Sequence, residues 1–319
     1  MENGLFNLKQ MYEKAIPWTG RIDGYSDEYL RWHQDIKTEN LEGLTESADF
    51  GIIGFACDEG VRRNKGRTGA KMGPELIRKA CANFPIIENI QIADYGNIVC
   101  DGPNLEEAQE NLANAVYKIQ SKNIKTIVFG GGHEVMFGHY SGLRKAYPNQ
   151  KIGILNFDAH FDNRAIDVSV GATSGTGFWQ IARQDENYNY LAIGIQKNSN
   201  TKVLFQEAES TSTTYILAED FVPENENKIY QIQQKWMDSI DILYVTVCLD
   251  VFAAPFAPGV SATAYNGIMP DYFFKKIFRK AISSEKLKAF DIAELNPDHD
   301  IDNRTAKLAA SFVYEVVNA

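Results

Sequence analysis

A short stretch in the middle of the chain carries side chains that are suited to hold a metal ion. The segment NFDAHFDNR, residues 156–164, places Asp158, His160 and Asp162 at every second position, directly after the apolar run KIGIL. Carboxylates and an imidazole in such close spacing are typical metal ligands. A polar loop at the end of a strand would have the same composition, so the segment alone leaves both interpretations open.

Similar side chains follow three other apolar runs. IVFG precedes GGGHE, which contains His133, and AFDIAEL contains Glu294 near its end. YVTVCL leads into Asp250, with Cys248 two residues earlier. Each of these residues alone has an ordinary structural explanation, such as a cap or a turn, but four such clusters together favour a metal site. A carboxylate-rich ligand set favours Mn²⁺ over Zn²⁺ or Fe²⁺. Two ions about 3.5–4 Å apart, bridged by carboxylates, lower the pKa of a shared water, so the predicted chemistry is hydrolysis.

The apolar runs themselves predict the elements that position these clusters. Strands are expected at 49–57, 124–130, 151–158, 190–195, 241–250 and 287–295. Helical patterns lie between or beside them at 73–84, 104–123, 225–240, 271–282 and 303–318. The runs are too continuous for half-exposed antiparallel strands, so the alternation predicts a parallel sheet with helices on both faces. Such sheets bind ligands outside the carboxyl ends of their strands, which is where the four clusters fall.

Composition excludes several other classes of protein. Asp and Glu number 42 against 32 for Lys and Arg, and the net charge of −10 argues against nucleic acid or an anionic membrane as the main partner. The four scattered cysteines form no CxxC pair, which argues against a secreted disulfide framework. We see neither a secretory signal nor a run of about 18 apolar residues that would cross a membrane. We therefore expect a cytoplasmic enzyme.

The chain resembles the ureohydrolase family, which includes arginase and agmatinase. GGGHE, NFDAHFDNR, CLDVFAAPFAPG and FDIAELNP are similar to the four signatures of the family, in order, and the likeness covers residues 50–318. The resemblance implies a three-layer α/β/α fold with a mostly parallel central sheet. It implies one ureohydrolase domain, which we assign to 1–319. The less regular residues 1–48 are expected to pack on this domain as an N-terminal extension. It also implies a homo-oligomer and a centre of two Mn²⁺ ions per subunit that hydrolyses a guanidino or formimino C–N bond.

The resemblance further implies a role for each candidate residue. One ion would lie among His133, Asp158 and Asp162, and the other among Asp158, His160 and Asp250. Cys248 would belong to the same metal centre. Asp162 and Glu294 would be the catalytic residues, and Glu294 would anchor the amidine cation of the substrate.

Within the family, four segments look most like formimidoylglutamase: CDEGVRRNKGRTGA, FAPGVSA, TSGTGFWQI and GIQKNSNT. This likeness implies hydrolysis of N-formimidoyl-L-glutamate to L-glutamate and formamide, in histidine degradation. Because that substrate is a dicarboxylate, arginine side chains that bind carboxylates bidentately are expected around it. The expected substrate-binding residues are Arg62, Arg63, Arg164, Ser174, Lys197 and Glu294. The segment RRNKGR could instead be a solvated surface loop.

Three positions depart from the family pattern. Cys248 replaces the Asp that usually bridges both metals, and because a thiolate prefers Zn²⁺ to Mn²⁺, occupancy of the second site stays open. Strand alternation would turn Cys248 and Asp250 to the same side. Phe178 stands where arginases carry a proton-shuttling histidine, and Arg164 stands where they carry an asparagine. Two alternatives therefore remain: another amidine hydrolase of the agmatinase or guanidinobutyrase type, and a metal-poor family member without catalytic activity.

Overall fold

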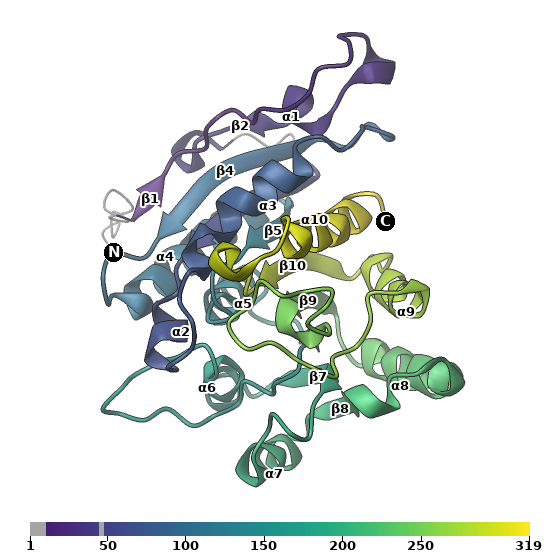
Figure 1. Cartoon of the computed structure of the whole chain (residues 1–319). Helices are drawn as coiled ribbons and strands as arrows, with labels where there is room; N and C mark the ends of the chain where they lie inside the picture. The colour runs from purple at the N-terminus through teal and green to yellow at the C-terminus, as the bar shows by residue number, and fades with distance from the viewer. Residues whose placement is uncertain (1–10, 45–47) are drawn as a thin grey trace.

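A single twisted sheet forms the centre of the molecule in the computed structural model, which describes residues 11–44 and 48–319 (Figure 1). Within these residues, ten strands pair in the order β1-β4-β3-β5-β10-β9-β6-β7-β8, with β2 also paired to β4. The strands are β1 (Tyr12–Glu13), β2 (Lys37–Thr38), β3 (Phe50–Ala56), β4 (Ile92–Val99), β5 (Lys125–Phe129), β6 (Ile152–Phe157), β7 (Asn189–Ile195), β8 (Thr214–Leu217), β9 (Ile242–Cys248) and β10 (Leu287–Ala293). Among these pairs, β1 runs antiparallel to β4 and the others are parallel.

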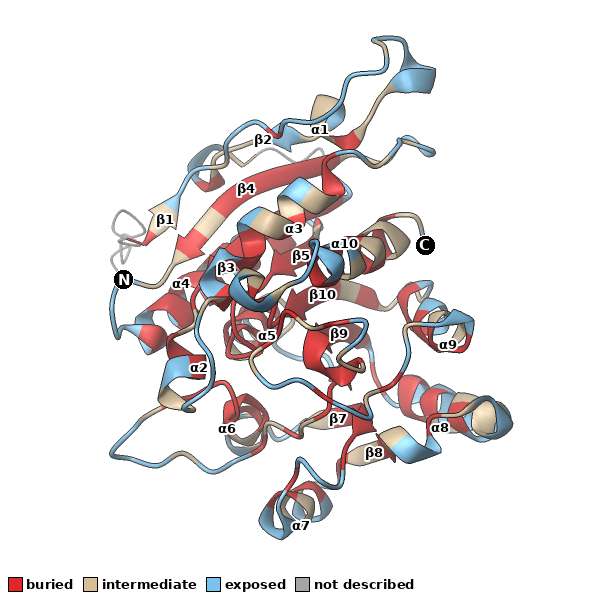
Figure 2. Ribbon diagram, viewed as in Figure 1, coloured by how far each residue is buried: buried red, intermediate tan, exposed pale blue. Residues whose placement is uncertain are grey.

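The central strands are apolar on both faces because helices cover the sheet on both sides. Every residue of β6 and β9 is buried, and Figure 2 shows the central strands as buried while the outward faces of the helices are exposed. Burial on both faces removes the need for alternating polar residues, which explains the continuous apolar runs in the sequence.

Two layers of helices pack against the two faces of the sheet. One hydrophobic core lies between the sheet and α3 (Gly73–Cys81), α8 (Glu226–Asp238), α9 (Tyr272–Ile282) and α10 (Arg304–Val317). The other includes residues of α4 (Leu105–Gln120), α5 (Val135–Ala146), α6 (Gly177–Gln184) and α7 (Lys202–Ser210). Two further helices are short: α1 (Trp32–Asp35), whose Trp32 belongs to the first core, and α2 (Glu59–Arg63). The predicted three-layer α/β/α fold with a mostly parallel sheet is confirmed.

The described N-terminal residues lie along the outer strand β4. β1 and β2 both pair with β4, and the indole Nε1 of Trp18 donates to Asp94 Oδ2 over 2.7 Å. Arg78 of α3 donates to both oxygens of the same carboxylate. Residues 1–10 and 45–47 fall outside the described part, so a single domain with all of 1–48 as its extension stays a prediction. No helix within residues 11–44 and 48–319 is long and apolar enough to cross a membrane.

Candidate metal and substrate site

Four adjacent strands at the centre of the sheet carry the predicted metal ligands at one edge. β5, β10, β9 and β6 are neighbours in that order. The side chains at their carboxyl ends are His133 after β5, Asp158, His160 and Asp162 after β6, Cys248 and Asp250 at and after the end of β9, and Glu294 after β10. All of these except Asp158 line one cavity of about 190 Å³. The buried carboxylate of Asp158 contacts both histidines of this set.

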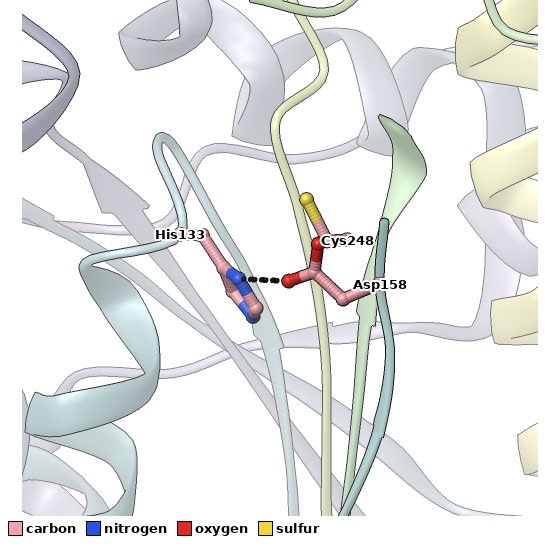
Figure 3. A group of neighbouring side chains, drawn as sticks. All are labelled: His133, Asp158 and Cys248. Carbon is pink, nitrogen blue, oxygen red and sulfur yellow. Dashed lines mark ion pairs between the residues drawn. The ribbon is translucent and has the colours of Figure 1, made fainter. Parts of the chain in front are cut away.

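Two groups of ligand atoms are close enough together to hold metal ions. Imidazole, carboxylate and thiol groups of His133, Asp158 and Cys248 form one group (Figure 3), and Asp158, His160 and Asp250 form the other. In each group the ligand atoms all lie within 4.8 Å of one another. Asp158 belongs to both groups, which is the arrangement that a bridging carboxylate requires.

His133 turns its Nδ1 atom toward the carboxylates. Nδ1 lies 2.9 Å from Oδ2 of Asp158 and 2.9 Å from Oδ2 of Asp162. Burial by itself would lower the pKa of His133, but the two carboxylates outweigh burial and raise this pKa well above its usual value. A cation among these groups would take the place of the imidazolium proton, since metal ligands must be deprotonated.

His160 occupies an equivalent position in the second group. Its Nδ1 atom lies 3.2 Å from Oδ2 of Asp250 and 3.5 Å from Oδ1 of Asp158. Burial would lower the pKa of His160, but Asp250 and Asp158 raise it well above the usual value. Burial would likewise raise the pKa of Asp158, yet the two histidines hold it far below its usual range. The carboxylate of Asp158 is therefore ionised and available to a cation.

Cys248 and Asp250 both line the cavity, although Asp250 lies beyond the end of the strand. β9 ends at Cys248, and Asp250 lies in a 3₁₀ turn, Leu249–Val251, after the strand. Burial, together with the surrounding carboxylates of which Asp158 acts most strongly, raises the pKa of the Cys248 thiol well above its usual value. The thiol is therefore protonated unless a bound cation offsets the negative charge, since a metal lowers the pKa of a coordinating thiol.

Glu294 binds the backbone through one carboxylate oxygen, and its other oxygen has no partner among the described residues. Its Oε1 atom accepts from the backbone N–H of His133 over 2.9 Å. Its Oε2 atom is buried and has no hydrogen-bond partner within the described residues. Burial, and then the charges of Glu134 and Asp250, raise the pKa of Glu294 to about 8. An unpaired buried acceptor costs about 1–3 kcal/mol, so a bound cationic donor would relieve this cost.

Backbone strain also occurs at this edge of the sheet. Asp162 and Glu294 have left-handed φ angles of 45° and 72°. Residues with side chains adopt this region at a cost of about 1–3 kcal/mol, and such residues cluster at functional sites. The strain here turns two carboxylates into the same cavity.

Besides Glu294, two predicted substrate-binding residues line the cavity, together with an asparagine that the sequence analysis missed. Arg164 Nη1 donates to Asn64 Oδ1 over 2.5 Å, and Asn64 Nδ2 donates to Ser174 Oγ over 3.1 Å. All three side chains belong to the cavity wall. Asn64 lies within the segment RRNKGR. That segment was predicted to bind substrate through its charged residues, and its neutral residue Asn64 was not predicted.

Three other predicted substrate-binding residues lie outside the cavity lining. Arg62 binds Glu59 of the same helix through two hydrogen bonds of 2.6 and 2.7 Å. Arg63 also binds Glu59, together with the carboxylate of Glu106. Lys197 is exposed and forms an ion pair with Glu219. None of the three belongs to the described cavity wall, so their charges act on neighbouring carboxylates.

Phe178 packs against a metal-ligand candidate instead of offering a proton. Its fully buried ring meets the imidazole of His133 edge-on at 5.9 Å between centroids. On its other side the ring stacks on Tyr190 at 4.1 Å. The ring of Phe178 therefore restricts the orientation of the His133 ring by steric contact.

Comparisons with known proteins show the family of the chain. Residues 48–318 match the arginase family, and the chain belongs to that family. A formimidoylglutamase of Clostridium tetani is 43% identical over 321 residues, which cover 94% of this chain and 93% of that protein. A formimidoylglutamase of Staphylococcus carnosus is 39% identical over 313 residues, which cover 97% of this chain and 100% of that protein.

Solved structures share the fold. A Trypanosoma cruzi formiminoglutamase crystallised with Mn²⁺ superimposes with a TM-score of 0.77 at 23% identity, covering 88% of this chain and 97% of that one. A formimidoylglutamase from Bacillus subtilis has a TM-score of 0.79 at 18% identity, covering 88% of this chain and 91% of that one.

Proposed function

We propose that this protein is a formimidoylglutamase, which hydrolyses N-formimidoyl-L-glutamate to L-glutamate and formamide. The observation that carries the proposal is one cavity with two metal-ligand groups that share Asp158 and with an arginine, Arg164, in its wall. Identities of 39–43% to proteins of that name support the same activity.

The donor set fits two divalent cations such as Mn²⁺. Carboxylates and imidazoles predominate, and Oδ1 of Asp250 is buried without a hydrogen-bond partner in the described part of the chain. His133, Asp158 and Asp162 would hold one ion, and Asp158, His160 and Asp250 the other, with Cys248 beside both. When bound, such an ion pair supplies a water of lowered pKa as the nucleophile. Because the thiol of Cys248 groups with His133 and Asp158, the site of those two residues is the one whose metal preference would depart from Mn²⁺.

The remaining side chains would bind the two ends of the substrate. The free Oε2 atom of Glu294 would accept hydrogen bonds from the amidine cation. Arg164, oriented by Asn64, would bind a substrate carboxylate through charge-assisted hydrogen bonds, with Ser174 as a further donor. Asp162 would take the proton of the attacking water and return it to the leaving amine as the C–N bond breaks.

We also propose that the enzyme acts in the cytoplasm, in histidine degradation, as a homo-oligomer. All four cysteines are free thiols, which suits a reducing compartment. Tyr265, Met269 and Tyr272 are more than half exposed in the segment that leads from β9 into the first residue of α9. Neighbouring exposed apolar side chains often mark protein interfaces, and light scattering on purified protein would measure the oligomeric state.

The direct test is formamide release from N-formimidoyl-L-glutamate by protein loaded with Mn²⁺. Urea release from arginine and agmatine, measured in parallel, tests the alternative amidine hydrolases. Formamide release without urea release is the expected result. Urea release from agmatine in place of formamide release would replace the proposal with an agmatinase, and no turnover of any substrate by metal-loaded protein would indicate a non-catalytic family member.

A further inference from the structure

The side chain of Arg63 uses all of its N–H groups within the protein. Its Nε atom donates to Glu59 over 2.9 Å. Nη1 donates to Glu106 over 2.6 Å and to the carbonyl oxygen of Ala172 over 3.0 Å. Nη2 donates to the carbonyl oxygen of Pro103 over 2.6 Å and to the second carboxylate oxygen of Glu106 over 3.1 Å. Because a guanidinium has five N–H groups, none is left to bind a substrate.

These hydrogen bonds join three segments that are distant in sequence. Glu59 and Arg63 belong to α2, Pro103 and Glu106 lie just before and within the first turn of α4, and Ala172 lies in the loop before α6. The backbone N–H of Ala172 also donates to Glu106, over 3.3 Å, so both backbone polar groups of Ala172 are held. Only 12% of the Arg63 side chain is exposed, so water competes little for these bonds.

Two of the joined segments carry residues of the cavity wall. Asn64 directly follows Arg63, at the C-terminal end of α2. Ser174 lies two residues after the loop carbonyl that Nη1 of Arg63 binds. The backbone N–H of Arg164 donates to the carbonyl oxygen of Gly175 over 2.9 Å, so the backbone of Arg164 is tied to the same loop. Arg63 therefore fixes the spacing between the segment that carries Asn64 and the loop that carries Ser174.

The orientation of the Asn64 amide follows from its two partners. Nη1 of Arg164 lies 2.5 Å from Oδ1 of Asn64, and because a guanidinium only donates, the amide oxygen must face it. The amide nitrogen then faces Ser174 and donates to its Oγ atom over 3.1 Å. Since Oγ accepts this bond, the hydroxyl hydrogen of Ser174 can be donated to a ligand. Arg164 and Ser174 thus both offer donors to the cavity that they line, as recognition of a carboxylate requires.

We propose that Arg63 is a positioning residue that sets the geometry of a carboxylate-binding subsite formed by Asn64, Arg164 and Ser174. The inference rests on the proposed function and extends it to a residue that touches no substrate and acts through its neighbours. Without the Arg63 guanidinium, α2 could shift relative to the loop, which would break the contact between Asn64 and Ser174 and release Arg164. A released side chain must be ordered again when substrate binds, so binding weakens while the reacting groups stay in place.

The test measures kcat and KM for formamide release from N-formimidoyl-L-glutamate by the Mn²⁺-loaded variants R63A and R144A. R144A is the matched control, because Arg144 of α5 is also partly buried and binds the carboxylate of Asp185 and backbone carbonyl oxygens. Arg144 is not among the described residues of the cavity wall. We expect R63A to raise KM by about 3- to 10-fold with kcat little changed, which is the lower part of the range for coupled residues of one hydrogen-bond network. R144A should leave both constants near those of the wild type.

A double-mutant cycle separates positioning of the subsite from a general loss of structure. If Arg63 acts through Arg164, the KM of the double variant R63A/R164A should stay close to that of R164A, whereas independent effects would multiply. E106A provides a second variant in case R63A does not fold. It removes the carboxylate of an exposed residue, which Arg63 binds through two hydrogen bonds, and should raise KM in the same direction but less than R63A.

Three results would overturn the inference. These are equal KM values in R63A and R144A, a double variant whose KM reflects the product of the two single effects, and a fall in kcat at unchanged KM in R63A. If R63A does not fold, an unchanged KM in E106A would overturn it in the same way. A wild type that releases no formamide would instead overturn the proposed function, and the inference with it.

Discussion

Replacement of Arg164 by alanine tests the proposed substrate preference most directly. The side chain lies in the cavity wall and is oriented by the 2.5 Å hydrogen bond from its Nη1 atom to Asn64. A charge-assisted hydrogen bond contributes about 1.5–3 kcal/mol. Because Arg164 is an exposed residue, solvent screens part of this energy. We therefore expect R164A to raise KM for formimidoylglutamate by about 10- to 30-fold, which corresponds to the lower part of that range.

The assay is steady-state formamide release at constant Mn²⁺ concentration, with kcat and KM determined separately. R62A serves as the matched control, since Arg62 carries the same charge on a nearby segment but pairs with Glu59 outside the cavity. R164K should give an intermediate KM, because lysine keeps the charge and loses the planar fork. An R164A protein whose KM equals that of R62A would refute the role assigned to Arg164.

Three further predictions concern the metal centre and its surroundings. D158A should lose both metal ions and activity, because Asp158 belongs to both ligand groups; normal Mn²⁺ content by atomic absorption would contradict this assignment. C248D should bind two Mn²⁺ ions more tightly than the wild type, because it supplies a hard ligand; equal affinities after dialysis under reducing conditions would exclude Cys248 as a ligand. Burial raises the pKa of Glu134 from 4.5 to about 7, so ionisation of this residue destabilises the metal-free fold as pH rises through that interval. The melting temperature of E134Q, measured by calorimetry, should therefore exceed that of the wild type at pH 8, and the difference should shrink toward pH 4.5. A difference that does not change with pH would show that ionisation of Glu134 is not its cause.

Much of the fold could be predicted because the apolar runs report burial directly. A parallel strand covered on both faces has no polar side, so β5, β6, β9 and β10 each stand out in the sequence. β4 was missed because Asp94, Gly96 and Asn97 interrupt its apolar pattern. The contacts that satisfy Asp94 come from Trp18 and Arg78, which are distant in sequence. Local pattern therefore fails where a polar residue is buried against partners from other elements.

The sequence by itself determined which residues gather at the candidate metal centre. Side chains that follow adjacent parallel strands must meet at one edge of the sheet, whatever the details of packing. His133, Asp158, His160 and Asp250 could therefore be grouped from their positions after apolar runs.

Only the tertiary structure decided which charged groups face that centre and which hydrogen-bond partners support it. Arg62, Arg63 and Lys197 carry the right charge for a dicarboxylate. They form ion pairs with neighbouring glutamates instead of lining the cavity. Thr246, whose Oγ1 atom contacts Nε2 of His133, is an ordinary β-strand residue, so its sequence context does not single it out. Side-chain pairing is set by distances of a few ångströms between elements remote in sequence, and those distances exist only once the sheet and its helices have packed.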